Sequence, residues 1–176
     1  MARIVVISRR HDKLARLIME NSYAAVAANG FDVQLEAGDI LCWLPQLNDP
    51  VDDSVQQLAT LVDRSLFPPQ KIVMLSIAGT ADDADATQLK HWYGKRAMQA
   101  VWAHQYAIKM IDELEPPYVI VRALPLGAGA PNIKVVDEGQ PLTGESVSEQ
   151  QLARVLETDL TTSKFDNHSI GVMPSK

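Results

Sequence analysis

Two adjacent arginines, Arg9 and Arg10, are the first residues whose types suggest chemistry. They follow residues 3–8 (RIVVIS), which have the pattern of a buried strand, and they precede a helical pattern. Guanidinium groups make charge-assisted hydrogen bonds to phosphate, and phosphate often binds where a strand leads into the N-terminus of a helix. We therefore expect Ser8, Arg9 and Arg10 to contact a phosphate, with a solvated basic turn as the alternative.

The turn that carries these arginines has no glycine, and neither does the rest of the first 29 residues. A strand, a tight turn and a helix open the dinucleotide-binding folds, in which glycines let the backbone approach a pyrophosphate. The chain therefore has the layout of a nucleotide-binding domain without its best-known phosphate loop.

Histidines, acids and the single cysteine each have a structural interpretation. His104 lies on the apolar stripe of a predicted helix, which favours a hydrogen-bonded core or interface residue, and His11 lacks an acid partner beyond Asp12. Cys42 lies inside a predicted buried strand and is expected to be inert. An acidic cluster predicts a solvated loop rather than a metal site, and the tryptophans predict core or interface positions. These residues are Asp82, Asp83 and Asp85, and Trp43, Trp92 and Trp102.

The elements that must position these residues alternate between strand and helix from residue 3 to residue 122, which predicts a three-layer α/β/α Rossmann-type fold with a mainly parallel sheet. Ser148 and Gln151 resemble a capping box. The predicted strands are 3–8, 31–36, 40–44, 71–76 and 118–122, with short strands at 134–136, 141–143 and 168–172; the predicted helices are 12–29, 49–66, 95–114 and 148–160, and residues 80–94 are expected to form a loop.

Parallel sheets bind ligands at the carboxyl ends of their strands. The candidate site is therefore built from the segments that follow the predicted strands. These segments are residues 8–10, 38–40, 45–48, 76–79 and 122–126.

The bulk composition limits the range of partners. The 176 residues predict one domain, 1–176, and the net charge of −6 argues against nucleic acid or an anionic membrane surface. One cysteine excludes an internal disulfide, and no apolar run approaches the ~20 residues that a membrane span needs. The arginines near the N-terminus interrupt any signal-peptide pattern, so we expect a cytoplasmic protein.

Residues 50–172 resemble the atypical short-chain dehydrogenase/reductase family, specifically its small bacterial, NAD(P)-binding, NmrA-like members. The matching segments are KIVMLSIAG (71–79), YAIKMIDE (106–113), YVIVRALPL (118–126) and VVDEGQPLTGESVSEQQLARVL (135–156). The resemblance implies a Rossmann-type sheet and an oxidoreductase or nucleotide-sensing role.

The chain departs from that family in three respects. The glycine loop is missing, the usual Arg-Pro is Arg122-Ala123, and the chain is short by about one βα unit for such a domain. Residues 3–8 match either the first strand of the family with a degraded loop, or its second strand, after which an arginine holds a 2′-phosphate.

The family's tyrosine acid and its lysine, one helical turn later, have no equivalent here. Tyr106 and Lys109 are three residues apart rather than four, which turns one of them by about 100° around the helix. Tyr118 and Arg122 have the right spacing but lie on a predicted strand. The sequence therefore predicts no general carbonyl reductase activity.

Residues 3–64 also resemble the NADPH-dependent FMN reductases of flavodoxin-like fold, in which a Ser/Arg/Asn-rich loop follows the first strand. Leu44-Pro45 and the helix after it fit this pattern, whereas residues 75–83 (LSIAGTADD) do not match the flavin loop.

The first resemblance implies a dinucleotide bound along the carboxyl edge of the sheet. Asp39 and Ile40 would meet the adenosine, and Ser76 and Ala78 the nicotinamide. Because the glycines are missing, we expect NADP or NAD to bind more weakly than about 100 μM, with NADPH preferred. A non-catalytic scaffolding or regulatory protein and a homodimer are the further expectations. The expected cofactor-binding residues are Ser8, Arg9, Arg10, Asp39, Ile40, Ser76, Ala78 and Arg122.

Overall fold

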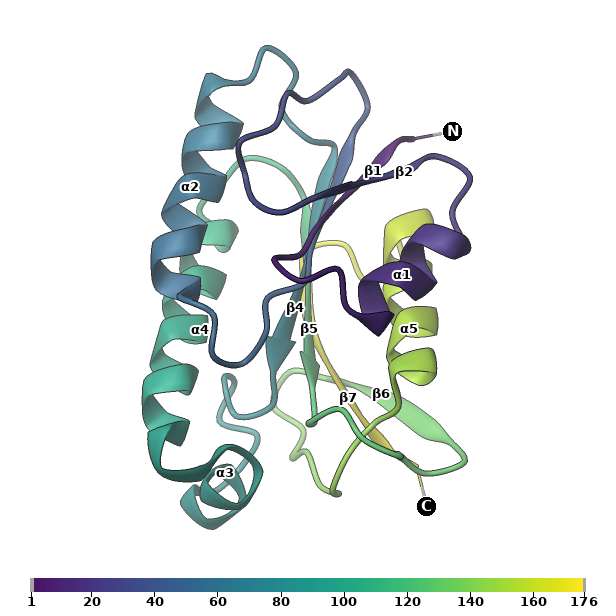
Figure 1. Ribbon diagram of the computed structural model, residues 1–176. Helices are drawn as coiled ribbons and strands as arrows, with labels where there is room; N and C mark the ends of the chain where they lie inside the picture. The colour runs from purple at the N-terminus through teal and green to yellow at the C-terminus, as the bar shows by residue number, and fades with distance from the viewer. Residues whose placement is uncertain (1, 176) are drawn as a thin grey trace.

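The structure, a computed structural model that describes residues 2–175, contains one seven-stranded sheet with helices on both faces (Figure 1). In chain order the elements are β1 (Ile4–Ile7), α1 (Lys13–Glu20), β2 (Ala25–Ala28), β3 (Ile40–Trp43), α2 (Val51–Arg64), β4 (Lys71–Ile77), α3 (Ala86–Tyr93), the 3₁₀ turn η1 (Gly94–Arg96), α4 (Ala97–Asp112), β5 (Tyr118–Ala123), β6 (Ile133–Asp137), α5 (Glu149–Thr161) and β7 (His168–Pro174).

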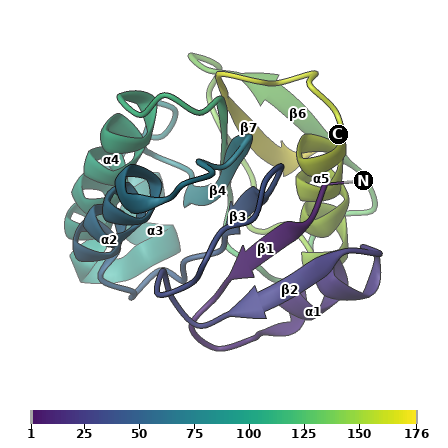
Figure 2. The same cartoon turned by 90° about the horizontal axis from the view of Figure 1, so that it is seen from above.

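The strands are arranged in the order β2-β1-β3-β4-β5-β7-β6, and all pairs are parallel except β6 with β7. Helices α2 and α4 cover one face, and α1 and α5 cover the other (Figure 2). The three-layer α/β/α Rossmann-type fold predicted from the sequence is confirmed, with β4 inside the sheet as expected.

The first five strands follow the doubly wound order 2-1-3-4-5, in which the direction of winding reverses between β1 and β3. The related order 3-2-1-4-5-6 has one further strand beyond β2, which accounts for the short N-terminal half of this chain. β1 thus occupies the place of the first strand of such sheets rather than that of the second.

The inner strands β1 and β3 are apolar throughout because both of their faces are covered. In β1, Ile4 and Val6 pack into the core beneath α1 and α5, whereas Val5 and Ile7 pack into the core beneath α2. Successive side chains of a strand point to opposite faces, so a fully buried four-residue strand supplies both cores.

The predicted helix 12–29 forms only in its first part, and the predicted strand 31–36 is wrong. α1 ends at Glu20, and Ala25–Ala28 forms the parallel edge strand β2 beside β1. Alanine favours helix, but pairing with β1 satisfies the backbone of this segment and overrides that preference. Phe31 and Leu35 are buried in the α2-side core without pairing in the sheet.

Three smaller predictions are also settled by the structure. Residues 80–94 contain the helix α3, which Asp85 and Gln88 begin with a capping box. The predicted strand 141–143 is absent from residues 2–175, and Leu142 is instead a buried core residue. The capping box of Ser148 and Gln151 at the start of α5 is confirmed.

The amino edge of the sheet holds a buried charged cluster. Lys71 Nζ donates to the carbonyl oxygens of Asp159 (2.9 Å) and Thr162 (2.6 Å) at the end of α5 and forms an ion pair with Asp166. The Asp159 carboxyl is buried, and neither of its oxygens has a hydrogen-bond partner among residues 2–175. Burial raises the pKa of Asp159 to about 7, an effect that the nearby Lys71 ammonium opposes.

Asp159 is therefore expected to make stability fall as the pH rises from about 4 to about 7. In this range the carboxyl ionises in the unfolded chain but stays protonated in the folded one, which penalises the folded state. Asp159→Asn should abolish the fall and should be about 2 to 4 kcal/mol more stable than the wild type at pH 8, with nearly equal stability at pH 4. Urea unfolding across this pH range measures the difference.

The control is Asp63→Asn, a substitution on the exposed face of α2. Its stability should follow that of the wild type at every pH. If the Asp159→Asn curve also runs parallel to the wild type, Asp159 does not titrate in this way.

Candidate functional site

The carboxyl ends of β1, β3, β4 and β5 meet at one edge of the sheet because these strands are parallel. In open α/β sheets, ligands bind in the crevice at this edge, where the strand order reverses. Three adjoining cavities lie along the edge. They share lining residues: Leu44 and Pro45 line the first and third, and Leu47 and Tyr93 line the first and second.

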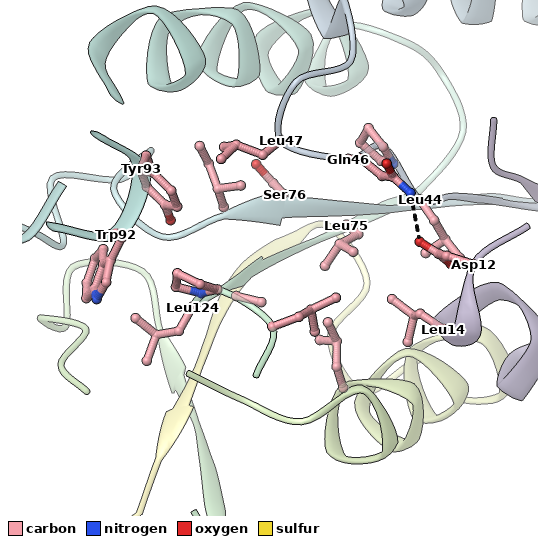
Figure 3. A pocket seen from close by; sticks show the side chains of 16 residues that line it. Asp12, Leu14, Leu44, Gln46, Leu47, Leu75, Ser76, Trp92, Tyr93 and Leu124 are labelled. Carbon is pink, nitrogen blue, oxygen red and sulfur yellow. Dashed lines mark hydrogen bonds between the residues drawn. The ribbon is translucent and has the colours of Figure 1, made fainter. Parts of the chain in front are cut away.

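The first cavity, which we call the central cleft, has a volume of about 290 Å³ and is mostly apolar (Figure 3). The last residues of β4 and β5 and the segments that follow β3 and β5 form its floor, and α3, α5 and the start of α1 complete its walls. Its lining residues are Asp12, Leu14, Leu44, Pro45, Gln46, Leu47, Leu75, Ser76, Ile77, Trp92, Tyr93, Ala123, Leu124, Pro125, Leu126 and Leu152.

The N-terminus of α1 points toward the central cleft, and the side chain of Asp12 caps it. The Asp12 carboxylate accepts hydrogen bonds from Ala15 N (3.0 Å) and from Gln46 Nε2 (3.2 Å; Figure 3). In dinucleotide-binding folds the pyrophosphate takes this position at the helix N-terminus. A carboxylate already lies there in this chain, so the residues at α1 do not fit a pyrophosphate.

The turn between β1 and α1 contains no glycine, yet one of its residues adopts a backbone conformation that favours glycine. His11 has a φ of 42°, in the left-handed region that side chains rarely adopt. His11 Nε2 lies 2.6 Å from Asn29 Oδ1, just after β2, and this contact holds the turn in place.

The two arginines of this turn do not line the central cleft. Arg9 forms an ion pair with Asp49 (3.3 Å), and Arg10 is exposed to solvent. Ser8 and Arg9 line the third cavity, the switch-point pocket of about 230 Å³ between the ends of β1 and β3. Ser8 is buried, and its Oγ has no partner among residues 2–175.

Ser76 lies in the floor of the central cleft and is bonded to a buried histidine. Ser76 Oγ lies 2.9 Å from His104 Nδ1, and both residues are almost completely buried. Burial lowers the pKa of His104 to about 4, so the imidazole is neutral at pH 7. His104 also lines the second cavity, the α4 pocket, which has a volume of about 250 Å³. His104 was predicted to be a hydrogen-bonded core residue, and that prediction is confirmed.

Asp39 and Ile40 lie at the opposite edge of the sheet, which corrects their expected contact with adenosine. Asp39 precedes β3 and accepts hydrogen bonds from Arg3 Nε (2.9 Å) and Arg3 Nη2 (2.6 Å). Burial would raise the pKa of Asp39, but the hydrogen bonds from Arg3 and from Glu36 N outweigh it and lower the pKa. The expectation depended on a strand at 31–36; the strand that precedes β3 is β2, which ends before Asn29 and Gly30.

Arg122 and Ala78 have buried, structural positions. The Arg122 guanidinium, which is fully buried, pairs with Asp83 and donates from Nε to Ser169 Oγ (2.8 Å). Ala78 donates from its backbone N to Ala123 O and accepts from Tyr93 Oη (2.9 Å). The hydrogen-bonding groups of both residues are therefore used inside the protein and do not face the cleft.

Asp83 is the residue that the sequence interpretation missed, because it was predicted to be solvated with its acidic neighbours. Its carboxylate is buried, and besides Arg122 it accepts from Gly79 N (2.5 Å). Gly79 has a φ of 105°, and a Cβ there would collide with Leu89 of α3. An acid four residues after a turn that contains glycine, here Ala78-Gly79, is the local signal that could have identified Asp83.

Neither metal clusters nor membrane helices occur in the described part of the chain. No group of three or more His, Cys, Asp or Glu side chains among residues 2–175 could hold a metal ion. Within the same range, no helix is both long and apolar enough to cross a membrane.

Comparison with solved structures identifies the fold. A short-chain dehydrogenase/reductase from Veillonella parvula superposes with a TM-score of 0.75 at 13% identity, covering 99% of this chain and 95% of that one. A Veillonella parvula short-chain dehydrogenase/reductase in complex with NADP superposes with a TM-score of 0.69 at 13% identity, covering 98% and 95%. A proposed NADH-flavin reductase from Streptococcus pneumoniae gives 0.73 at 12% identity, covering 99% and 100%.

No protein-family model matches the sequence, and no curated protein sequence matches it. At identities this low the structural likeness shows the fold alone. The chain thus shares its Rossmann-like α/β fold with these short-chain dehydrogenases/reductases and with this reductase.

From the position of Tyr106 we predict that this protein does not reduce carbonyl compounds. Tyr106 lies on the outer face of α4, where its hydroxyl accepts a hydrogen bond from Gln56 of α2 (3.4 Å), and it does not line the central cleft. With NADPH, a panel of aldehydes, ketones and quinones should give no turnover above background. Tyr106→Phe should leave this result unchanged and alter stability by less than about 0.5 kcal/mol. Robust NADPH oxidation that disappears in Tyr106→Phe would contradict the prediction.

Proposed function

We propose that this protein is a degenerate member of the atypical, NmrA-like short-chain dehydrogenases/reductases, which binds nicotinamide dinucleotides weakly. In this proposal it works in the cytoplasm as a nucleotide-responsive regulatory protein rather than as a reductase. The observation that carries the proposal is the Asp12 carboxylate at the N-terminus of α1, held there by Ala15 N and Gln46 Nε2.

Electrostatics and geometry both oppose a pyrophosphate at this position. Two like charges about 4 Å apart repel by about 1 kcal/mol even in water, and by more where water is excluded. Without glycines the backbone also loses amide–phosphate hydrogen bonds worth about 1.5 to 3 kcal/mol each. Arg9 and Arg10 recover part of this loss if they meet a 2′-phosphate near the switch-point pocket, which favours NADPH over NADH.

Calorimetric titration tests this proposal directly. Wild-type protein should bind NADPH more weakly than about 100 μM and NADH more weakly still. Asp12→Asn keeps a side chain that can cap α1 but removes the negative charge, so it should bind NADPH about fivefold more tightly.

The matched control is Asp85→Asn, because Asp85 caps α3 in the same way and does not line the central cleft. It should leave the affinity for NADPH unchanged. Tight binding of NADH by the wild type, or an unchanged affinity in Asp12→Asn, would refute the proposal.

A flavin-dependent reductase is the second candidate, and one observation favours it. The first five strands have the order 2-1-3-4-5 that flavodoxin shares, and in that fold FMN binds at the β1/β3 switch point. The switch-point pocket occupies this place. Purified protein with the yellow absorbance of bound flavin, or FMN that binds more tightly than NADPH, would support this candidate instead.

For the quaternary structure we propose a homodimer through the outer face of α4. Met98, Trp102 and Tyr106 are spaced four residues apart along this face, and Trp102 is 60% exposed. The exposed acids Asp52 and Asp53 of α2 lie beside this face. The exposed cation Arg96 lies just before α4, and Lys109 lies in its last turn, so a two-fold related copy would be charge-complementary.

Sedimentation equilibrium tests the homodimer. The wild type should sediment as a dimer at micromolar concentrations, and Trp102→Glu should be a folded monomer because it places a charge in the apolar contact. A wild type that stays monomeric throughout would contradict this interface.

A further inference from the structure

The α4 pocket contains a buried polar atom that the fold leaves without a partner. A neutral imidazole offers one N–H donor and one acceptor nitrogen. His104 uses Nδ1 with Ser76 Oγ, whereas His104 Nε2 is buried and has no hydrogen-bond partner among residues 2–175. Buried polar groups in folded proteins are nearly always paired, so this nitrogen marks a place where a ligand atom would complete the bonding.

The hydroxyl and the imidazole share their protons in one of two ways. When Ser76 donates to Nδ1, Nε2 carries the remaining proton and offers a donor toward the α4 pocket. When Nδ1 donates to Ser76, the hydroxyl donates into the central cleft instead. A ligand with an acceptor atom in the α4 pocket selects the first arrangement. The low pKa of His104 supports a neutral ring in both arrangements.

The same pocket has an unpaired cation at its rim. Arg96 precedes α4, lines the pocket and is exposed, and it forms no ion pair within residues 2–175. Asp49, the one acid that lines the pocket, is already bound by Arg9 and by Gln46 N (2.9 Å). The N-terminus of α4 has no side-chain cap, so its helix dipole adds to the positive potential.

The polar pocket adjoins an apolar one. Leu47 and Tyr93 line both the α4 pocket and the central cleft, so the two cavities meet at these side chains. The central cleft, with Leu75, Leu124 and Leu152 in its lining, suits a small hydrocarbon or aromatic group.

We propose that the α4 pocket binds small amphipathic carboxylic acids, whose carboxylate pairs with Arg96 and accepts a hydrogen bond from His104 Nε2 while the apolar part lies in the central cleft. The carboxylate subsite at Arg96 and His104 involves neither the N-terminus of α1 nor the switch-point pocket, and its test uses no NADPH. The outcome of that test therefore does not depend on how tightly the protein binds NADPH.

Hydrocinnamate and its neutral amide, hydrocinnamamide, are matched probes for the full-length protein. Titration followed by two-dimensional NMR should show that hydrocinnamate binds and changes the chemical shift of the His104 Nε2 nitrogen. Hydrocinnamamide should bind at least about fivefold more weakly because it cannot form the charge-assisted bond to Arg96.

Arg96→Gln should weaken hydrocinnamate binding at least about fivefold, whereas Lys95→Gln, which removes the neighbouring exposed cation outside the pocket, should leave it unchanged. His104→Gln tests the second contact, and its unfolding curve shows whether the fold survives. If hydrocinnamate fails to bind, binds no better than its amide, or binds the Arg96→Gln variant as well as the wild type, the proposal is overturned.

Discussion

The buried ion pair between Arg122 and Asp83 connects the segments on which the site depends. Arg122 belongs to β5 and also bonds Ser169 of β7, while Asp83 holds the turn after β4 through Gly79 N. The carbonyl oxygen of Asp83 further accepts from Leu142 N (2.7 Å), which fastens the segment before α5. Removing one partner of such a pair would leave a buried charge uncompensated, at a cost of about 3 to 5 kcal/mol.

This pair also sets the wall of the central cleft. The turn that Asp83 holds leads directly into α3, which carries Trp92 and Tyr93 into the cleft (Figure 3). Tyr93 then donates to Ala78 O, and burial, with Asp83 nearby, raises the pKa of its hydroxyl. The buried ion pair between Arg122 and Asp83 therefore helps to position the aromatic wall formed by Trp92 and Tyr93.

The parts of the fold that could be predicted from the sequence are those determined by residues close together in the chain. The apolar run of residues 71–77 forms a strand, and Ser148 with Gln151 begins a helix, because an apolar run and a capping box are both formed by residues close together in the chain. The edge strand β2 could not be predicted in this way, since Ala25–Ala28 has helical preference and becomes a strand only beside β1. That one error moved Asp39 and Ile40 to the wrong edge of the sheet.

The site was predictable to a similar extent. Ser8, Arg9 and Ser76 lie at the carboxyl edge, as a parallel sheet requires. The ion pair of Arg122 with Asp83 and the bond of Ser76 to His104 join residues 39 and 28 positions apart. Contacts over such sequence distances leave no local pattern. Arg122, Asp83 and His104 could therefore be interpreted only from their residue types.

The turn at His11 links the edge strand β2 to the start of α1 through the contact between His11 and Asn29. A left-handed residue other than glycine costs about 1 to 2 kcal/mol, and the contact between His11 and Asn29 offsets part of this cost. Asn29 follows β2, a partly exposed edge strand that is paired on one side only. Fraying of β2 would therefore release the strained turn at the same time, so that local opening of the edge and rearrangement at the mouth of the cleft form one cooperative event.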